Sequence, residues 1–304
     1  MTTRARLRQC GAVLAGALLL GACGSAGASN STAVGSPGTI TVVTSTDVWG
    51  SIVRTIGGNR ISVTSLITDP SADPHSYEAN GQNELAVSKA TLILENGGGY
   101  DDFLDRMVDA VHSKATVLNA VEISGYVPKD GELNEHVWYD FPTVAKVVAQ
   151  VRSALSAASP ADAASFAANA TALDAQLTAL ERKEAAVKAA SAGVGVAITE
   201  PVPLYLLEAA GLQNRTPPEF SEAIESENDA PAAVIKENLA LFTGHQVKAL
   251  VYNEQTTGPQ TEQVLAAAKA NRIAVVPVTE TLPAGTDYVS WMNANVDAVA
   301  AAVR

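Results

Sequence analysis

Cysteine is nearly absent from this sequence. Of its 304 residues only Cys10 and Cys23 are cysteines, and Cys10 lies in an N-terminal segment that we expect to be removed. The folded part therefore contains no disulfide and no thiolate ligand for a metal, because both require cysteine side chains. Its stability must come from packing, and residues 38–304 suffice for two domains of ordinary size.

Basic residues are scarce too. Lys and Arg together number 20 against 32 Asp and Glu, which gives a net charge of −12 at pH 7. Proteins that bind nucleic acids neutralise phosphates with Lys and Arg, so this balance argues against a nucleic acid as partner. An acidic surface attracts cations modestly, although an ordinary solvated acidic face has the same composition.

The sequence also lacks the short motifs of several large enzyme classes. It contains no GxSxG, no P-loop, no GxGxxG and no HExxH. These motifs position nucleophiles, phosphates, dinucleotides and catalytic zinc ions, respectively. Their absence argues against an enzyme.

The N-terminal segment has the pattern of an export signal. Arg4, Arg6 and Arg8 precede the apolar run 12–20, which is too short to span a membrane. We therefore expect a signal peptide over residues 1–22.

The end of that segment, Leu20-Gly21-Ala22-Cys23, resembles the lipobox of bacterial lipoproteins. In such proteins the cysteine is lipidated and becomes the first mature residue, so we expect a lipid anchor on Cys23. Residues 23–38 are mostly small and are expected to form a flexible tether. The alternative is an ordinary secretory signal cleaved near Ala22.

Strand-like and helix-like segments alternate through the next part of the chain. The pattern predicts strands at 39–43, 61–67, 90–94 and 116–121 and helices at 47–56, 84–89 and 101–113. Strands interleaved with helices are typical of a parallel sheet covered on both faces. We therefore expect an N-terminal α/β lobe over residues 39–159.

Residues 160–190 predict one long helix. They contain no glycine, no proline after Pro160 and much alanine, and one face is mostly apolar at three- and four-residue spacing. About 30 residues at ~1.5 Å each span about 45 Å, enough to run along two lobes. A coiled-coil partner helix is less well supported, because the apolar stripe ends after few heptads.

The alternation then repeats. The predicted strands are 194–198, 248–252 and 273–278, and the predicted helices are 204–210, 230–241 (with Asp229 as N-cap), 261–270 and 288–303. Residues 191–304 should thus form a C-terminal α/β lobe. The expected fold class is α/β, with two lobes, each a parallel-type sheet flanked by helices, joined by one long helix.

Two of the four histidines stand out. His75 follows the strand 61–67 on a loop stiffened by two Asp-Pro steps, since proline lacks a backbone donor and restricts the residue before it. His136 lies two residues before Trp138, a position that also suits a core histidine. His112 and His245 are expected at the surface.

Two carboxylates occupy similar positions. Glu200 follows the strand 194–198 and precedes a helix, whose dipole favours an ionised carboxylate. Glu280 follows the strand 273–278. Like His75, both come after strands, where open α/β sheets bind ligands. Two imidazoles and two carboxylates suit a divalent first-row metal, although none of them is paired in a tight motif.

From about residue 39 onward, the chain resembles the metal-binding lipoproteins of bacterial zinc/manganese ABC transporters. The matching segments are Asp-Pro-His-Ser-Tyr-Glu at 73–78, His-Val-Trp-Tyr-Asp at 136–140, Glu200 with Tyr205 and Gly211-Leu212, Val-Tyr-Asn-Glu at 251–254 and Val-Thr-Glu-Thr at 278–281. The resemblance implies two α/β lobes joined by a long helix. It also implies metal ligands at His75, His136, Glu200 and Glu280.

The sequence departs from the family pattern near the implied ligands. Asn134-Glu135 stands where the family often has Asp-Pro, and Glu280 stands where aspartate is usual. Glu200 occupies a position that is histidine in many zinc binders and glutamate in manganese binders. Two carboxylates make the site harder, which favours Mn²⁺, whereas the Irving–Williams order favours Zn²⁺. Glu280 is expected to be the least firmly held ligand, with water or Glu254 able to replace it.

The resemblance implies an extracytoplasmic lipoprotein that captures Zn²⁺ or Mn²⁺ between its lobes. It would deliver the ion to an ABC permease while anchored to the cell membrane through Cys23, as a monomer. One alternative is a surface adhesin that carries a structural metal. The other is a metalloenzyme with a two-histidine, one-carboxylate site and Glu280 as a free base. Four protein ligands favour capture, because catalytic metal sites keep a position open.

Overall fold

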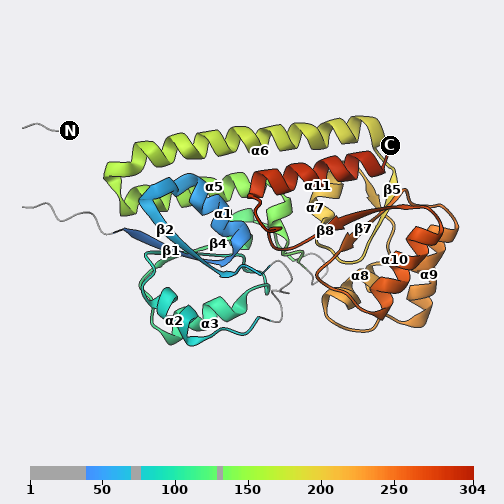
Figure 1. Cartoon of the computed structure of the whole chain (residues 1–304), viewed down its shortest axis with the longest axis horizontal. Coiled ribbons are helices and arrows are strands. Elements are labelled where there is room, and N and C mark those ends of the chain that lie inside the picture. The colour runs from blue at the N-terminus through green and yellow to red at the C-terminus, as the bar shows by residue number, and fades with distance from the viewer. Residues whose placement is uncertain (1–38, 70–76, 129–132) are drawn as a thin grey trace, which may run out of the picture. The chain divides into compact units, whose positions relative to one another are not determined.

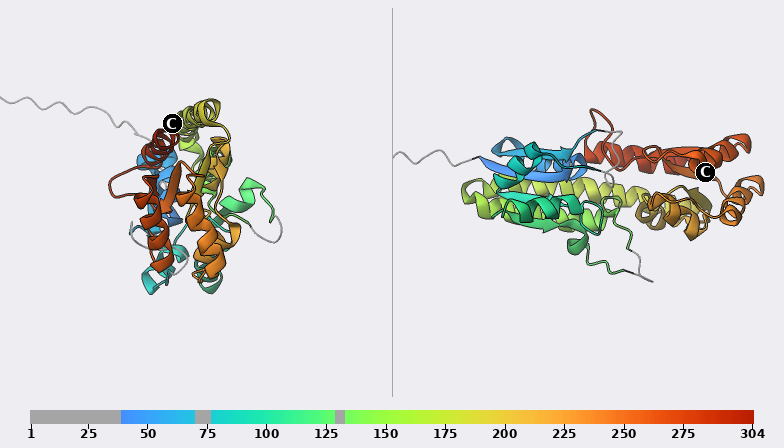
Figure 2. Two further views of the ribbon diagram at one scale, coloured as in Figure 1. Left: turned by 90° about the vertical axis from the view of Figure 1, so that its right-hand side faces the viewer. Right: turned by 90° about the horizontal axis from the view of Figure 1, so that it is seen from below.

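The computed structural model describes residues 39–69, 77–128 and 133–304. The expected signal peptide, Cys23 and the whole of the expected tether lie outside these residues, as does His75. Two four-stranded sheets with only parallel pairings form the centre of the described chain, and helices flank each sheet (Figures 1 and 2). The predicted fold class is confirmed.

The N-terminal lobe is built on a sheet with the strand order β2-β1-β3-β4. Its strands are β1 (Ile40–Thr46), β2 (Ile61–Ile67), β3 (Leu92–Glu95) and β4 (Thr116–Asn119), and its helices are α1 (Asp47–Gly57), α2 (Gly81–Ser88), α3 (Asp102–Ala110), α4 (Ala120–Ser124) and α5 (Phe141–Ala158). Alternate residues of the central strands face opposite sides. Val42 and Leu94 join the core under α1 and α5, whereas Val43 and Ile93 pack with α2 and α3.

The C-terminal lobe repeats this plan with the order β6-β5-β7-β8. Its strands are β5 (Gly195–Ile198), β6 (Gln213–Asn214), β7 (Ala249–Asn253) and β8 (Ala274–Val278), and its helices are α7 (Leu204–Ala209), α8 (Pro218–Glu225), α9 (Ala232–Thr243), α10 (Pro259–Ala270) and α11 (Tyr288–Ala302). Val251 faces the core shared with α7 and α11, and Leu250 faces α8, α9 and α10. Both sheets are therefore buried on two sides.

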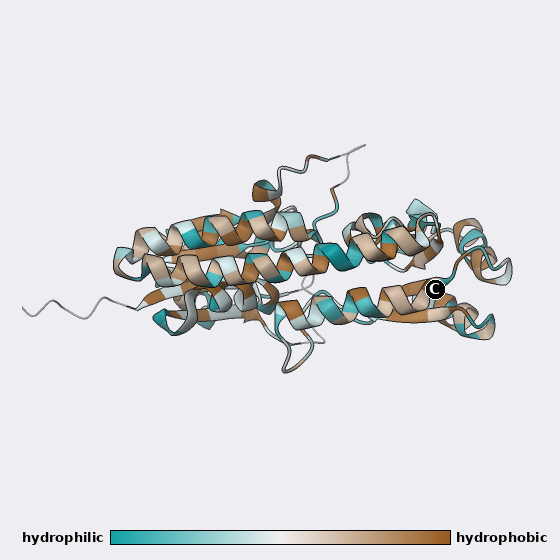
Figure 3. Ribbon diagram, turned by 90° about the horizontal axis from the view of Figure 1, so that it is seen from above, coloured by the Kyte–Doolittle hydropathy of each residue, from teal (hydrophilic) through white to brown (hydrophobic). Residues whose placement is uncertain are grey.

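The long helix α6 (Ala163–Ser191) packs against elements of both lobes. It contacts α1 and α5 of the N-terminal lobe and α7 and α11 of the C-terminal lobe. Its predicted apolar stripe is buried, from Phe166 at one end to Val187 at the other. Seen from above, the covering helices carry hydrophilic and hydrophobic residues side by side (Figure 3), as amphipathic surface helices do. No helix of the described residues is long and apolar enough to cross a membrane.

A second connection between the lobes lies between β8 and α11. The backbone N–H of Leu282 donates to Asp47 Oδ1 (3.1 Å), and that of Tyr288 donates to Ser51 Oγ (3.0 Å). The Tyr288 hydroxyl donates to the carbonyl of Trp138 (2.6 Å). All three bonds join the segment 282–288 to the N-terminal lobe. The two lobes are therefore connected both by α6 and by this segment.

Several elements differ from the sequence-based expectation. The pattern missed α5 and α8, and the strand expected over 116–121 ends at Asn119, whose side chain caps α4 by accepting from Glu122 N. Asp229 is not the N-cap of α9. That helix begins at Ala232 after Pro231, and the Asp229 carboxylate instead accepts from Gln260 Nε2 (3.0 Å).

Glu184 is the one acidic side chain within the buried stripe of α6. It is 3% exposed, and its Oε1 has no hydrogen-bond partner among the described residues. Burial, reinforced by the charges of Asp140 and Glu181, raises its pKa from 4.5 to about 8. In the unfolded chain Glu184 ionises near its ordinary pKa, so folding stability falls as pH rises from about 4.5 to about 8.

We predict that Glu184→Gln removes this loss. At pH 8 the metal-free variant should be more stable than the wild type, on the order of 4 kcal/mol, since a pKa raised from 4.5 to about 8 costs about 1.4 kcal/mol for each unit. Urea unfolding at pH 5 and pH 8 in the presence of a chelator measures the difference. The control is Glu237→Gln, which removes the same charge from an exposed position of α9. Equal pH dependence in wild type and Glu184→Gln would contradict the prediction.

Candidate metal centre

Three of the four implied ligands lie in the described residues, and each is in a defined place. Glu200 follows β5 by two residues, Glu280 follows β8 by two residues, and His136 immediately precedes a short 3₁₀ turn at Val137–Tyr139. All three are buried, with His136 fully so. His75 lies outside the described residues.

The strand register brings the two carboxylates together. Ile198 of β5 lies opposite Val251 of β7, so Glu200 lies level with Asn253, the last residue of β7. Asn253 in turn pairs with Val278 of β8, two residues before Glu280. Strands β6 and β7 lie on opposite sides of β5 within the sheet, so the strand order reverses at β5. Ligands bind at such a reversal of strand order in open α/β sheets.

Asn253 links the carboxylates directly. Its Nδ2 donates to Glu200 Oε2 (2.7 Å) and to Glu280 Oε1 (2.8 Å). The backbone N–H of Glu280 also donates to Gln255 Oε1. These bonds hold Glu280 in place, whereas the sequence led us to expect a loosely held side chain, and Glu254 is exposed. One amide thus orients two acidic side chains toward a common point.

His136 is positioned by the two residues before it. The Nδ1 of its ring donates to Asn134 Oδ1 (2.7 Å), which leaves Nε2 to face the carboxylates. Asn134 in turn contacts the C-terminal lobe: its Nδ2 donates to the Pro201 carbonyl (3.2 Å), and Tyr205 OH donates to the Asn134 carbonyl (2.7 Å). Asn134, which departs from the family pattern, therefore orients the imidazole and joins the lobes.

A glycine-rich turn of the N-terminal lobe supports the same segment from the other side. Asn96 Nδ2, just after β3, donates to the Glu135 carbonyl (2.9 Å). Gly98 has φ +72°, and a Cβ added there would lie 3.2 Å from Glu135 Cβ. Only glycine fits this close approach without strain. The segment 134–136 is therefore held between the end of β3 and the start of α7.

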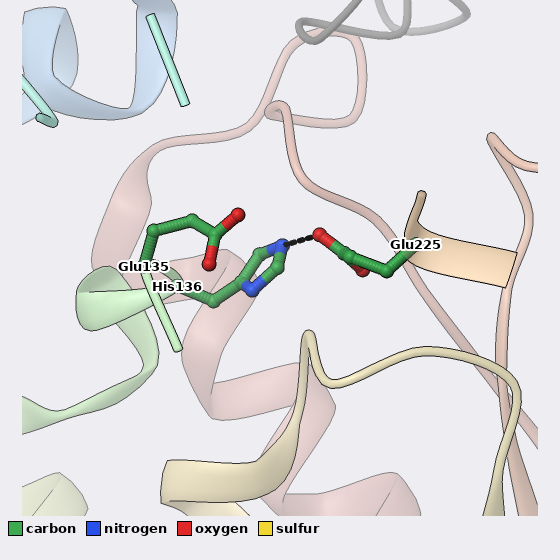
Figure 4. A group of neighbouring side chains, drawn as sticks. All are labelled: Glu135, His136 and Glu225. Atoms are coloured by element: carbon green, nitrogen blue, oxygen red, sulfur yellow. Dashed lines mark ion pairs between the residues drawn. The ribbon is translucent and has the colours of Figure 1, made fainter. Parts of the chain in front are cut away.

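Three acidic side chains surround the imidazole. Glu225 Oε1 lies 3.5 Å from His136 Nε2, and Glu280 Oε2 lies 3.8 Å from the same nitrogen. Figure 4 shows the ring nitrogen directed at the Glu225 carboxylate, with Glu135 alongside. Ligand atoms of Glu135, His136 and Glu225 all lie within 4.8 Å of one another, close enough to hold a metal ion.

The charges of this cluster shift the pKa values of its members strongly. Burial lowers the pKa of His136, but the negative charges of Glu225, Glu280 and Glu135 outweigh it and raise the pKa to about 10. Burial, with Glu225 and Glu280 nearby, raises the pKa of Glu200 to about 8. At neutral pH the metal-free cluster therefore holds one proton on His136 and one on Glu200. A divalent cation would supply the same positive charge.

The cluster borders a cavity and an aromatic wall. A cavity of about 440 Å³ is lined in part by Asn134, Glu135, Ser221, Glu222 and Glu225. On the buried side, the His136 ring packs edge-on against Trp138, with 5.1 Å between ring centroids. One side of the cluster is thus apolar and closed, and the other is acidic and bordered by open space. His112 and His245 are exposed, as expected.

Sequence reasoning missed Glu225 and Asn253. Asn253 ends a strand beside Glu200 and lies in one of the matching segments, so the strand-end rule that found Glu200 applied to it equally. Glu225 is the last residue of a helix that the pattern did not predict, and its proximity to His136 arises only from tertiary packing. No local signal identifies it.

Comparison with known proteins places these features in context. The family model described as ZnuA, zinc-uptake complex component A, periplasmic, matches residues 42–302. The manganese-binding lipoprotein MntA of Halalkalibacterium halodurans is 31% identical over 125 residues, 39% of this chain and 40% of that protein. The iron-binding protein YfeA of Yersinia pestis is 26% identical over 132 residues, 41% of each chain. The matched segments thus span well under half the length of these relatives.

Solved structures share the fold. The periplasmic zinc-binding protein TroA of Treponema pallidum superposes with a TM-score of 0.71 at 22% identity, over 88% of this chain and 99% of TroA. A structure of ZnuA gives a TM-score of 0.73 at 18% identity, over 88% of this chain and all of that one. At these identities the likeness is one of fold.

Metal binding is predicted to release protons. An ion binds only deprotonated imidazole and carboxylate, and at pH 7 His136 and Glu200 each carry a proton. Binding should release about one to two protons at pH 7, and affinity should rise steeply up to about pH 8 and less steeply above it. Calorimetric titration with Mn²⁺ in buffers of different ionisation enthalpy counts the protons. The exposed His245→Gln control should give the same number, and release of none at pH 7 would contradict the prediction.

Proposed function

The chain belongs to the family of periplasmic zinc-uptake components, and from this premise we propose that it captures a divalent transition metal, Zn²⁺ or Mn²⁺, outside the cytoplasmic membrane and delivers it to an ABC permease. Members of this family are transport components and not enzymes. The alternative prediction of a metalloenzyme is therefore wrong. The observation that carries the proposal is a fully buried imidazole, His136, whose Nε2 faces the carboxylates of Glu225 and Glu280.

The proposed ligands are His75, His136, Glu200 and Glu280. His136 and the two glutamates come from the buried cluster, in which Asn253 holds both carboxylates. His75 is included because its motif and its place after β2 match the family pattern. The names of the proteins compared above mention zinc, manganese and iron, which supports a first-row divalent cation as cargo.

We further propose the organisation expected from the sequence. A signal peptide over residues 1–22 and a tether over 23–38 would precede an N-terminal lobe (39–159), a linker helix (160–190) and a C-terminal lobe (191–304). Lipidation of Cys23 would anchor the protein, as a monomer, on the extracytoplasmic face of the cell membrane. The relative MntA is named a lipoprotein, which supports this anchor.

Substitution of the ligands tests the capture site. His75→Ala, Glu200→Ala and Glu280→Ala should each weaken Mn²⁺ and Zn²⁺ binding strongly, with Glu280 as severe as Glu200 because Asn253 holds both. At an ion concentration about 100 times the wild-type Kd, bound metal stabilises the native state by about 2.7 kcal/mol. This stabilisation, measured as a melting shift, should vanish in the three variants. The exposed Glu254→Ala control should keep it, and a full shift in His75→Ala would refute the ligand set.

The anchor is tested separately. Cys23→Ser should move the protein from the membrane fraction to the soluble extracytoplasmic fraction, because the acylated cysteine supplies the membrane affinity. Fractionation followed by immunoblotting measures the change, and Cys10→Ser is the matched control. Unchanged membrane association of the Cys23→Ser protein would exclude the lipobox. Loss of Mn²⁺ or Zn²⁺ uptake in cells that lack the protein would separate transport from adhesion.

A further inference from the structure

We propose that Glu225 is a direct ligand of the metal cargo and that it biases the site toward hard, oxygen-preferring ions such as Mn²⁺. This inference rests on the proposed function and adds to it a residue that neither the sequence pattern nor the family resemblance implies. It is supported by the distances at His136, the way in which Glu225 is held, the balance of charge and the chemistry of the resulting donor set.

The distances from His136 Nε2 favour Glu225 as a metal ligand at least as strongly as they favour Glu280. Two ligand atoms bound to one first-row ion lie about 3.0–3.5 Å apart when each bond is about 2.1 Å long. Glu225 Oε1 is 3.5 Å from His136 Nε2, and Glu280 Oε2 is 3.8 Å from it. An ion bound to Nε2 would therefore have the Glu225 oxygen within bonding reach with little side-chain movement.

Glu225 lies on helix α8, which is packed against the core of the C-terminal lobe. It ends α8, which begins at Pro218, and the preceding residues Phe220 and Ile224 are buried in the core under α8, α9 and α10. The Glu225 side chain is 16% exposed, against 3% for Glu280. It also lines the 440 Å³ cavity together with Glu222. Glu225 thus borders both the open space and the imidazole, whereas Glu280 is enclosed.

An ion pair with a protonated His136 would balance one of the two carboxylates near its Nε2 but not both. Glu225 and Glu280 both lie within 4 Å of Nε2, and Glu200 is joined to Glu280 through Asn253. One imidazolium supplies a single positive charge. Buried carboxylates in excess of their counter-charges are costly. A divalent cation coordinated between Glu225 and Glu280 would supply one positive charge for each of them.

The donor set that results is rich in oxygen. Among the described residues the proposed set has one imidazole nitrogen and the carboxylates of Glu200, Glu225 and Glu280. Glu135 adds a further oxygen, because its ligand atom lies within 4.8 Å of those of His136 and Glu225. Carboxylates suit Mn²⁺, whereas a closed four-coordinate site of nitrogen and sulfur donors suits Zn²⁺. Adding Glu225 to the proposed ligands raises the number of donors above four. That number fits an ion that prefers five or six ligands.

The test compares Glu225→Gln with Glu222→Gln in the otherwise complete protein. Glu222 lies on the same helix and lines the same cavity, so its variant removes the same charge close by. Loss of a residue that only orients a ligand lowers metal affinity about 10–100-fold, so loss of this ligand should lower Mn²⁺ affinity on the order of 100-fold. Zn²⁺ affinity should fall clearly less, and Glu222→Gln should leave both affinities nearly unchanged.

Two further measurements separate ligation from a through-space charge effect. Glu225→Asp keeps the charge but withdraws the carboxylate by one methylene, so it should weaken Mn²⁺ binding to a degree between wild type and Glu225→Gln. With Co²⁺ as probe, Glu225→Gln should absorb visible light more strongly than wild type, because four-coordinate Co²⁺ has more intense bands than five- or six-coordinate Co²⁺. The Glu222→Gln spectrum should match wild type. Metal-free melting curves establish that each variant folds.

The outcomes are distinct. Wild-type Mn²⁺ affinity and Co²⁺ spectrum in Glu225→Gln would overturn the inference and leave the proposed function standing. Equal losses in Glu225→Gln and Glu222→Gln, with Glu225→Asp unaffected, would reduce Glu225 to a charge effect and also overturn it. A wild-type protein that binds neither Mn²⁺ nor Zn²⁺ would overturn the proposed function itself. If Glu225→Gln does not fold, Glu225→Asp decides: unchanged Mn²⁺ affinity then refutes ligation.

Discussion

The confinement of several carboxylates around one buried imidazole is the constraint on which the rest of this structure depends. His136 is fully buried, and Glu225 and Glu280 both approach its Nε2. Negative charges so close together repel one another, and burial removes the water that would screen them. Without metal, protons on His136 and Glu200 offset the repulsion, as their raised pKa values indicate. The fold therefore keeps several carboxylates close together, and their negative charge must be balanced by protons or by a metal ion.

Holding such a cluster requires rigid elements from both lobes. The C-terminal lobe contributes strand ends in register, where Asn253 lies between Glu200 and Glu280. The N-terminal lobe contributes the turn after β3, whose Asn96 binds the Glu135 carbonyl. The segment with His136 lies between them, and its Asn134 bonds to residues at the start of α7. The side chains of His136, Glu200 and Glu280 are thus held by amide hydrogen bonds, which pre-organises them at the boundary between the lobes.

The sequence predicted the fold better than the site. Alternating apolar runs and one long amphipathic stripe suffice for two parallel sheets and α6, because local periodicity reflects which face is buried. The strand-end rule located Glu200 and Glu280, since register and topology follow from the same pattern. Glu225 could not be found in this way: α8 is a short helix between two prolines and a turn, and its contact with His136 depends on how α8 packs against the sheet. The firmness of Glu280 likewise depends on Gln255 and Asn253, which act across strands.

The two connections between the lobes, through α6 and through the segment between β8 and α11, have a consequence for recognition by the proposed permease. A rotation of one lobe against the other would have to bend α6 and also break the bonds that join Leu282 and Tyr288 to Asp47, Ser51 and Trp138. Two separate restraints of this kind remove the hinge on which a large clamshell movement depends. Empty and loaded molecules would then have nearly the same outline. The proposed permease would have to distinguish them by local order and surface potential around the His136 cluster, rather than by overall shape.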